Sequence, residues 1–120
     1  MKTVALVAAA GLGRRMGCVC PKTLLKIGRK PILAWTLGIF QAHPEIDEIV
    51  LVFQPDRLQA ARDLVRRYRF SKVSAIVAGG ATRQISVKNG LAVVDAASDF
   101  VAIHDGARPF VKIELIKRIL

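Results

Sequence analysis

A glycine-containing loop with three cationic side chains follows the first apolar run of this 120-residue chain. The loop has the sequence Ala8-Ala9-Ala10-Gly11-Leu12-Gly13-Arg14-Arg15-Met16 and is closed by Pro21-Lys22. Small residues and glycines let a backbone approach a ligand closely and direct several N–H groups at it, which suits oxyanions. Arg14, Arg15 and Lys22 add positive charge within the length of one loop. The pattern therefore predicts a site for a phosphate-rich ligand.

Two better-known glycine loops do not match this segment. A phosphate-binding P-loop requires G-x-x-x-x-G-K-[ST], whereas Gly17 is followed by Cys18. A dinucleotide-binding turn requires G-x-G-x-x-G, and Met16 stands where the third glycine would be. Taken alone, the loop is also compatible with a flexible strand-to-helix turn that carries surface arginines.

A second glycine turn lies later in the chain, in Gly79-Gly80-Ala81-Thr82-Arg83-Gln84-Ile85-Ser86. It leads into an expected helix, and Ser86 falls in the first helical turn, where unpaired N–H groups can bind polar or anionic atoms. Arg83 is either a ligand group or a tether for the loop. An ordinary turn with a capping threonine explains the segment equally well.

Asp105 is the candidate metal ligand. It follows the expected strand Phe100–His104, and of the nine acidic residues it alone is placed at the carboxyl end of an expected strand. One carboxylate beside a polyphosphate suits Mg²⁺, because this ion keeps several waters and shares ligands with the substrate. The alternative is that Asp105 caps a turn or pairs with Arg108. We expect His104 to be a packed or hydrogen-bonded strand residue rather than a metal ligand.

The elements that must position these loops alternate along the chain. Apolar runs predict strands at Val4–Ala8, Glu48–Phe53, Val73–Ala78 and Phe100–His104. Helices are expected at Pro31–Gln41, from a cap at Asp56 to Arg69, from Ala81 or Thr82 to Ala96, and from about Lys112. The order predicts an α/β fold with an open, mostly parallel, Rossmann-like sheet and helices on both faces. The three loops should then meet at the carboxyl edge of the sheet.

Two details of the helices carry further expectations. Gly90 lies inside the third helix, where glycine costs about 1 kcal/mol relative to alanine, so we expect close packing on the sheet there. Asp63 precedes Arg67 at the i, i+4 spacing that supports a helix.

The composition limits the class of protein. A hydrophobic content of 52% excludes disorder, and no apolar stretch approaches the roughly 20 residues that a membrane span requires. With no secretory signal at the first residues, we expect a cytoplasmic protein without a membrane partner. Cys18 and Cys20 lie too close for an ordinary disulfide and are expected to be free thiols. The apolar pattern continues to Leu120, so we expect residues 1–120 to belong to a single domain that is truncated at its C-terminal end.

The net charge of +10 raises the possibility of nucleic-acid binding. Much of this charge falls on one predicted helix, whose buried stripe is expected to be Leu58, Ala61, Val65 and Tyr68. Its arginines are Arg57, Arg62, Arg66, Arg67 and Arg69. No aromatic platform or recognition helix accompanies them, so we interpret them as a solvated helix face and expect no nucleic-acid partner.

Taken together, the three loops closely resemble the 2-C-methyl-D-erythritol 4-phosphate cytidylyltransferases of the nucleotidyltransferase superfamily. The resembling segments are A-A-G-L-G-R-R-M with P-K, then G-G-A-T-R-Q-I-S-V-K-N-G-L, then H-D-G-A-R-P-F. The first motif marks only the superfamily, whereas the combination is much more specific and is shared with ribitol-5-phosphate cytidylyltransferases. Ala81 departs from an aspartate found in some members, and Thr23 from a glutamine found in many.

The resemblance implies transfer of CMP from CTP to 2-C-methyl-D-erythritol 4-phosphate, with release of pyrophosphate, in non-mevalonate isoprenoid synthesis. It implies Mg²⁺ as cofactor and a homodimer when the protein is full length. The implied site comprises Arg15 and Lys22 for catalysis, Ala9, Ala10, Gly11, Gly13, Gly79, Gly80, Arg83 and Ser86 for nucleotide binding, and Asp105 for the metal, with Arg14 and Gly106 in support. The alternatives are a ribitol-5-phosphate or other sugar-phosphate cytidylyltransferase, or a non-catalytic nucleotide-binding fragment.

Overall fold

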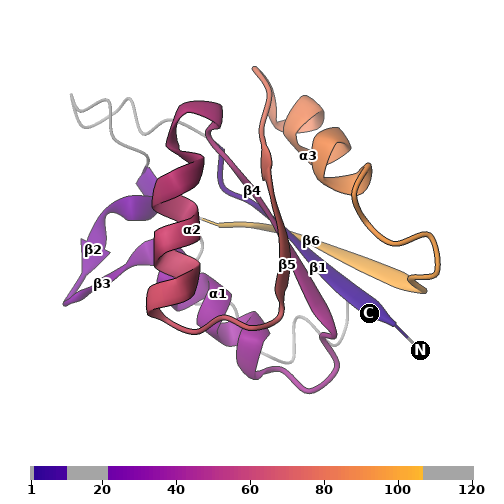
Figure 1. Cartoon of the computed structure of the whole chain (residues 1–120), viewed down its shortest axis with the longest axis horizontal. Helices are drawn as coiled ribbons and strands as arrows, with labels where there is room; N and C mark the ends of the chain where they lie inside the picture. The colour runs from indigo at the N-terminus through magenta and orange to yellow at the C-terminus, as the bar shows by residue number, and fades with distance from the viewer. Residues whose placement is uncertain (1, 11–21, 107–120) are drawn as a thin grey trace.

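A parallel β-sheet forms the centre of the structure. The computed structural model describes residues 2–10 and 22–106, with only the backbone of Lys22. Within these residues, one sheet has four parallel strands in the order β5-β4-β1-β6 (Figure 1). The strands are β1 (Thr3–Ala8), β4 (Glu48–Phe53), β5 (Val73–Ala78) and β6 (Phe100–Asp105). All four predicted strands are confirmed, and only the start of β1 and the end of β6 move, by a single residue each.

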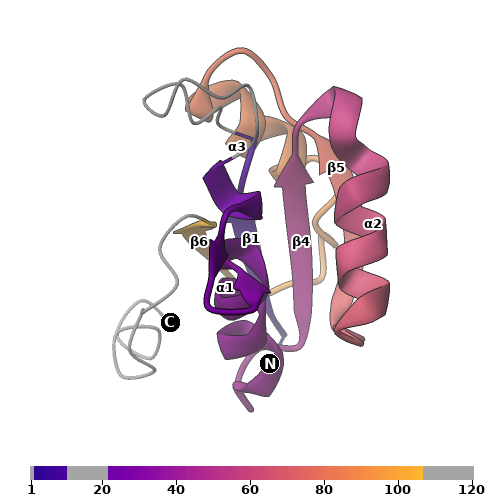
Figure 2. The same ribbon diagram turned by 90° about the vertical axis from the view of Figure 1, so that its left-hand side faces the viewer.

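Helices cover both faces of this sheet. Helices α1 (Ile32–Ala42) and α2 (Leu58–Arg67) lie on one face and α3 (Arg83–Leu91) on the other (Figure 1). Figure 2 faces the side that carries α1 and α2. The strand side chains alternate accordingly: Val7 belongs to the apolar cluster with α1 and α2, whereas Leu6 lies against Gly90 of α3. The predicted α/β fold is confirmed.

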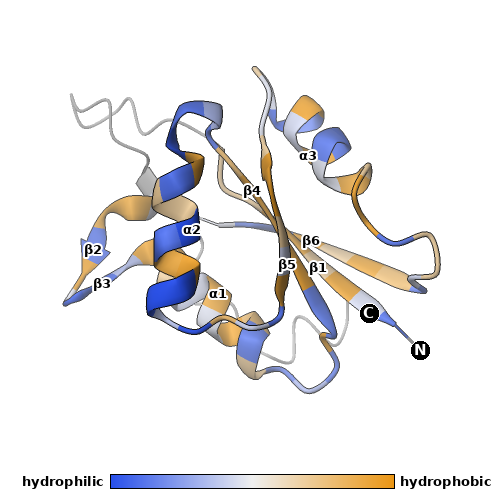
Figure 3. Cartoon of the chain, viewed as in Figure 1, coloured by the Kyte–Doolittle hydropathy of each residue, from blue (hydrophilic) through white to orange (hydrophobic). Residues whose placement is uncertain are grey.

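The strands supply much of the core. Val4, Ala5, Leu6 and Val7 of β1 are all fully buried, and the strands are apolar along most of their length (Figure 3). A parallel strand covered on both faces has no solvated side, so its sequence is a continuous apolar run rather than an alternating one. An ideal Cβ on Gly90 would lie 2.8 Å from Leu6 Cδ1, which confirms the expected close approach of α3 to the sheet.

The charged face of α2 is solvated, as expected. Its exposed arginines are Arg62, Arg66 and Arg67, and the helix is strongly hydrophilic on its outer side (Figure 3). Of the predicted stripe, Ala61 is buried while Leu58, Val65 and Tyr68 are half-buried; Leu64, which was not predicted, is buried as well.

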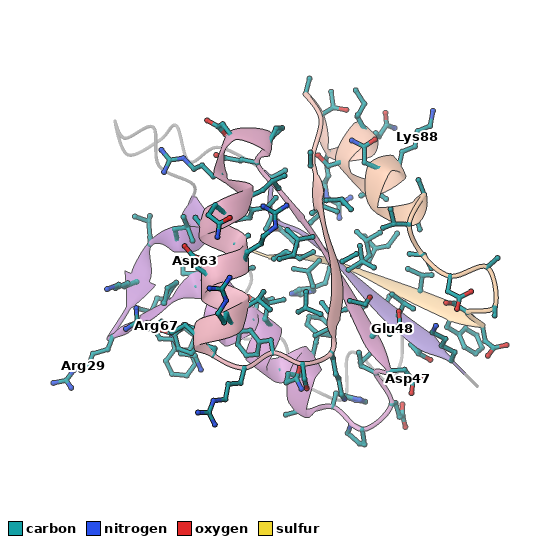
Figure 4. The ribbon with its side chains drawn as sticks, in the orientation of Figure 1. Arg29, Asp47, Glu48, Asp63, Arg67 and Lys88 are labelled. Carbon is teal, nitrogen blue, oxygen red and sulfur yellow. The ribbon has the colours of Figure 1, made fainter. Side chains whose placement is uncertain are left out.

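Asp63 and Arg67, both among the described residues, form no ion pair although they have the i, i+4 spacing on α2; Lys2 pairs with Glu48 and with Asp95. Asp63 instead accepts a hydrogen bond of 2.9 Å from Gln59, and the guanidinium of Arg67 lies 5.8 Å from the Tyr68 ring centroid. Figure 4 labels Asp63 and Arg67 on α2.

Several predicted helix ends were wrong. Helix α1 begins at Ile32, one residue after Pro31. Helix α2 begins at Leu58 after a 3₁₀ turn (η3, Pro55–Arg57), and no side chain of the described residues caps η3 or α2, so Asp56 is not the cap. It ends at Arg67 rather than Arg69, since Arg69 takes the left-handed φ of 56° that commonly follows a helix.

Helix α3 begins directly after Thr82, one of the two predicted starting positions, and ends before the predicted residue. Thr82 is the N-cap, and its hydroxyl accepts a 3.1 Å hydrogen bond from the Ile85 amide. The helix stops at Leu91 instead of Ala96. Beyond it, the Asp95 carboxylate accepts from the Ala97 amide, a local turn that competes with helix. The helix predicted from about Lys112 and the thiols of Cys18 and Cys20 lie outside the described residues.

A small hairpin that was not predicted connects the first loop to α1. It follows a 3₁₀ turn (η2, Lys22–Leu24) and pairs β2 (Lys26–Ile27) with β3 (Lys30–Pro31) in antiparallel fashion. The indole N–H of Trp35 donates to the Ile27 carbonyl oxygen (3.2 Å), and the Lys30 ammonium lies 4.7 Å from the Trp35 ring centroid. These contacts fasten the hairpin to α1.

Candidate functional site

The carboxyl ends of the four parallel strands share one edge of the sheet. From β1 the chain proceeds to β4 and β5 on one side, and it then returns to β6 on the other side of β1. The strand order therefore reverses at β1, and open α/β sheets bind ligands outside the carboxyl ends of their strands at such a point. Ala9 and Ala10 follow β1 at this point, and Asp105 and Gly106 end and follow β6.

The three predicted loops meet at this edge in their described parts. An ideal Cβ on Gly79 would lie 2.3 Å from the Cβ of Ala10, and one on Gly106 would lie 2.8 Å from the Cβ of Ala9. Real Cβ atoms do not approach so closely, so both positions require glycine. The loop after β1 thus contacts the loop after β5 on one side and the loop after β6 on the other.

Backbone hydrogen bonds fix these contacts. The amide of Ala9 donates to the Val52 carbonyl oxygen (2.8 Å), and the amide of Gly79 donates to the Phe53 carbonyl oxygen (2.8 Å). A ligand contact of Ala9 would therefore use its carbonyl oxygen rather than its amide.

Helix α3 clamps the Gly79–Gly80 turn through two side chains. Ser86 is only 4% exposed, and its hydroxyl oxygen accepts a 3.1 Å hydrogen bond from the Gly80 amide. Asn89, three residues further along the helix, donates to the Ala78 carbonyl oxygen (3.1 Å). Sequence reasoning selected Ser86 and missed Asn89, although the i, i+3 spacing from Ser86 places both on one helix face. Arg83 is the first residue of α3, and its side chain is exposed.

Asp105 is the last residue of β6, in register with Ala8 of β1, and its side chain is half-buried. Its neighbour His104 packs its ring 5.2 Å from that of Phe40 in α1, which agrees with a packed strand residue. Within the described ranges no three His, Cys, Asp or Glu side chains form a metal-binding cluster. A lone carboxylate still fits Mg²⁺, which is commonly held by one or two carboxylates together with substrate phosphates.

Most of the first predicted loop lies outside the described residues. Gly11, Gly13, Arg14 and Arg15 lie outside the described residues, as does the side chain of Lys22. The backbone of Lys22 belongs to η2, where the next residue, Thr23, is 3% exposed. Among the described helices none is long and apolar enough to cross a membrane.

Comparison with known proteins identifies the family. The family profile described as IspD, 2-C-methyl-D-erythritol 4-phosphate cytidylyltransferase, matches residues 3–120. The chain belongs to this family. A 2-C-methyl-D-erythritol 4-phosphate cytidylyltransferase of Clostridium botulinum (strain Langeland) is 47% identical over 116 residues, which cover 97% of this chain and 51% of the relative. The enzyme of Geobacter metallireducens is 45% identical over 122 residues, covering 98% of this chain and 53% of the relative.

The fold agrees with the family as well. The crystal structure of 4-diphosphocytidyl-2C-methyl-D-erythritol synthase from Anaerococcus prevotii superposes with a TM-score of 0.80 at 32% identity, covering 97% of this chain and 48% of that one. The resemblance inferred from the three motifs is confirmed. The chain spans about half the length of the curated relatives that it matches.

Proposed function

We propose that the protein carrying this chain transfers CMP from CTP to 2-C-methyl-D-erythritol 4-phosphate and releases pyrophosphate, as a step of non-mevalonate isoprenoid synthesis. The observation that carries this proposal is the contact of Ala10 with Gly79 and of Ala9 with Gly106. These contacts bring parts of all three family motifs to one edge of the sheet. The choice of reaction follows from the family to which the chain belongs.

The chemistry explains the types of residue in these motifs. The phosphate of the acceptor is already an anion near neutral pH, so its attack on the α-phosphorus of CTP needs no general base. The difficulty is the repulsion between an anion and a polyanion, followed by the shift of charge onto the departing pyrophosphate. Positioned cations lower both barriers by electrostatic stabilisation. We assign this role to Arg15 and Lys22: the arginine offers a rigid fork to two oxygens, and the lysine a compact charge.

The nucleoside part of CTP is assigned to the loops after β1 and β5. Ala9, Ala10 and Gly11 would line one side of the cytidine, and Gly79, Gly80 and Ser86 the other. Because the Ser86 oxygen accepts from the Gly80 amide, its own hydroxyl proton remains available as a donor. Gly13 and Arg83 are assigned supporting contacts to the nucleotide.

Asp105 is assigned as the protein ligand of a divalent cation, Mg²⁺ by expectation. When bound, such an ion would neutralise charge on the triphosphate. The contribution of this chain is to present the carboxylate at the end of β6, in register with the end of β1. We further propose that the full-length protein is a homodimer, which sedimentation would test.

The experiment that tests the reaction is pyrophosphate release by the full-length protein. Each of the four nucleoside triphosphates is offered with 2-C-methyl-D-erythritol 4-phosphate and, separately, with ribitol 5-phosphate, whose cytidylyltransferases share these motifs. We expect release with CTP and the first acceptor. Pyrophosphate release with ribitol 5-phosphate alone would show that the protein is a ribitol-5-phosphate cytidylyltransferase instead. A protein that binds CTP but releases no pyrophosphate in the presence of either acceptor would be a non-catalytic nucleotide-binding protein.

A further inference from the structure

A buried hydroxyl on α1 contacts the turn that follows the candidate metal ligand. Thr36 is fully buried, and its Oγ1 lies 3.0 Å from the carbonyl oxygen of Gly106, a residue 70 positions later in the chain. The same oxygen lies 3.2 Å from the carbonyl oxygen of Ile32, the usual i−4 partner of a helical threonine. The hydroxyl therefore shares its single proton between its own helix and the Asp105–Gly106 turn.

Thr36 is an exception among the buried residues of its helix. The others are Leu33, Ala34, Leu37 and Phe40, all of them apolar. A valine would fill a similar volume at this position, and an alanine would favour the helix more. What a threonine adds is a donor that reaches the Gly106 carbonyl oxygen, a group that is costly to bury without a partner.

The Thr36 hydrogen bond completes the restraint of the turn. The Gly106 amide donates to the Ala8 carbonyl oxygen (2.9 Å), which fixes the peptide plane that joins Asp105 to Gly106. An ideal Cβ on Gly106 would lie 2.8 Å from that of Ala9, so the loop after β1 packs directly against the turn. The Thr36 hydroxyl fixes the next peptide plane, through the Gly106 carbonyl group. Both peptide planes of Gly106, the residue that directly follows Asp105, are thus held.

We propose that Thr36 is a positioning residue, whose hydroxyl holds the Asp105–Gly106 turn so that the Asp105 carboxylate is set for metal-assisted nucleotide binding. This inference rests on the proposed function for the role of Asp105. Groups that orient a metal ligand commonly change metal affinity or activity by about 10- to 100-fold when they are removed. Thr36 touches neither substrate nor metal; it acts through the turn.

Three substitutions in the full-length protein separate the hydroxyl from the volume of the side chain. Thr36→Ser and Thr36→Ala both remove the methyl group and differ only in the oxygen atom, and Thr36→Val removes the hydroxyl while keeping the shape. Thr3→Ala is the matched control, since Thr3 is 3% exposed at the opposite end of β1. Two quantities are measured: the Mg²⁺ concentration for half-maximal CTP binding by calorimetry, and hydrogen exchange of the Gly106 amide.

We expect Thr36→Ala and Thr36→Val to raise the Mg²⁺ requirement about tenfold or more and to speed exchange at Gly106. Thr36→Ser should stay within about twofold of the natural protein on both measures, because its hydroxyl is kept. Thr3→Ala should lower the melting temperature without moving either quantity. Thr36→Val provides the comparison if Thr36→Ala does not fold.

Equal behaviour of the serine and alanine variants would overturn the inference, as would an equal shift in the Thr3→Ala control. Failure of the proposed function looks different. A natural protein that binds no CTP would refute the reaction, while the exchange rate at Gly106 would still decide whether the Thr36 hydroxyl holds the turn.

Discussion

The Cβ of Ala10 occupies the space that a side chain on Gly79 would need, because an ideal Cβ on Gly79 lies 2.3 Å from it. The hydroxyl oxygen of Ser86 lies 2.8 Å from the same point. Gly79 is therefore enclosed between the loop after β1 and the helix that follows its own turn. Its missing side chain lets the two loops form one surface.

Gly79→Ala should destabilise the protein by about 1–3 kcal/mol, since the added methyl group must displace backbone or buried atoms. It should also weaken CTP binding, because Ala10 and the Gly79–Gly80 turn move apart. Gly38→Ala is the matched control: its Cβ would meet atoms only at 3.9 and 4.0 Å, and in the helix it should stabilise by up to about 1 kcal/mol. Urea unfolding and calorimetry measure both effects. Equal unfolding midpoints for the two variants would contradict the packing argument.

Arg15→Ala and Lys22→Ala should each lower the rate of pyrophosphate release by roughly two orders of magnitude or more, because each removes a charge that stabilises the reacting phosphates. The circular dichroism spectrum should not change. Arg62→Ala, an exposed arginine on α2, is the control and should turn over normally. Near-normal rates in either site variant would remove that residue from the mechanism. Binding of nucleic acid that is lost in Arg62→Ala but kept in Arg15→Ala would instead support a nucleic-acid-binding role.

Asp105→Asn should raise the Mg²⁺ concentration for half-maximal activity about tenfold or more, because a neutral amide is a weaker ligand of this hard cation than a carboxylate. The substitution keeps the size of the side chain, so the melting temperature should change little. Asp63→Asn on the exposed face of α2 controls for the loss of one negative charge. An unchanged Mg²⁺ titration curve would show that Asp105 is not a metal ligand.

Stability at acid pH should depend on the ion pairs of Lys2. The hydrogen bond from Lys2, and after it that from the Ala97 amide, hold the pKa of Asp95 below its ordinary value of 3.8. Because the folded state lowers this pKa, the contribution to stability is complete above about pH 4 and is lost as the pH falls through the folded-state value. The pKa of Lys2 is raised above 10.5, first by Asp95 and then by Glu48, so its contribution persists at neutral pH and is lost only in strong alkali.

Asp95→Asn should therefore flatten the fall in stability below about pH 4, since the variant keeps the oxygen that the Ala97 amide needs but has no charge to lose. Urea midpoints between about pH 2.5 and 6 provide the measurement. Both partners are solvent-accessible, so the difference should shrink in high salt. If the urea midpoints of the natural protein and the variant fall equally with decreasing pH, the ion pair contributes nothing measurable to stability, which is common for surface ion pairs.

The strands could be predicted from the sequence because their environment leaves a simple signature. Glu48–Phe53 and Val73–Ala78 were found with their observed ends, as expected for strands enclosed between helix layers. The hairpin at Lys26–Pro31 escaped prediction because its two strands have two residues each, and β2 is exposed. The end of α3 was predicted wrongly because the helical pattern extends to Ala96, whereas the Asp95 carboxylate forms a turn with the Ala97 amide.

The sequence predicted the site residues that lie at the ends of strands, but not those that act through contacts between distant segments. Asp105 stands out because a charge follows an apolar run. Thr36 does not, since a threonine in an apolar helix has the pattern of core packing, and its partner Gly106 is 70 residues away. The sequence alone also does not show why position 79 must be glycine, because the reason is its contact with Ala10 in the folded chain.

The position of β1 in the sheet has a consequence for the assembly of the fold. Of the four strands β1 is made first, yet it lies between β4 and β6, and its Thr3–Ala8 ladder with Phe100–Asp105 cannot form until nearly a hundred further residues have been translated. During that interval one flank of a largely apolar strand has no backbone partner and is open to other nascent chains. Pairings so remote along the polypeptide also slow folding. The earliest of these strands to leave the ribosome is thus among the last to be enclosed.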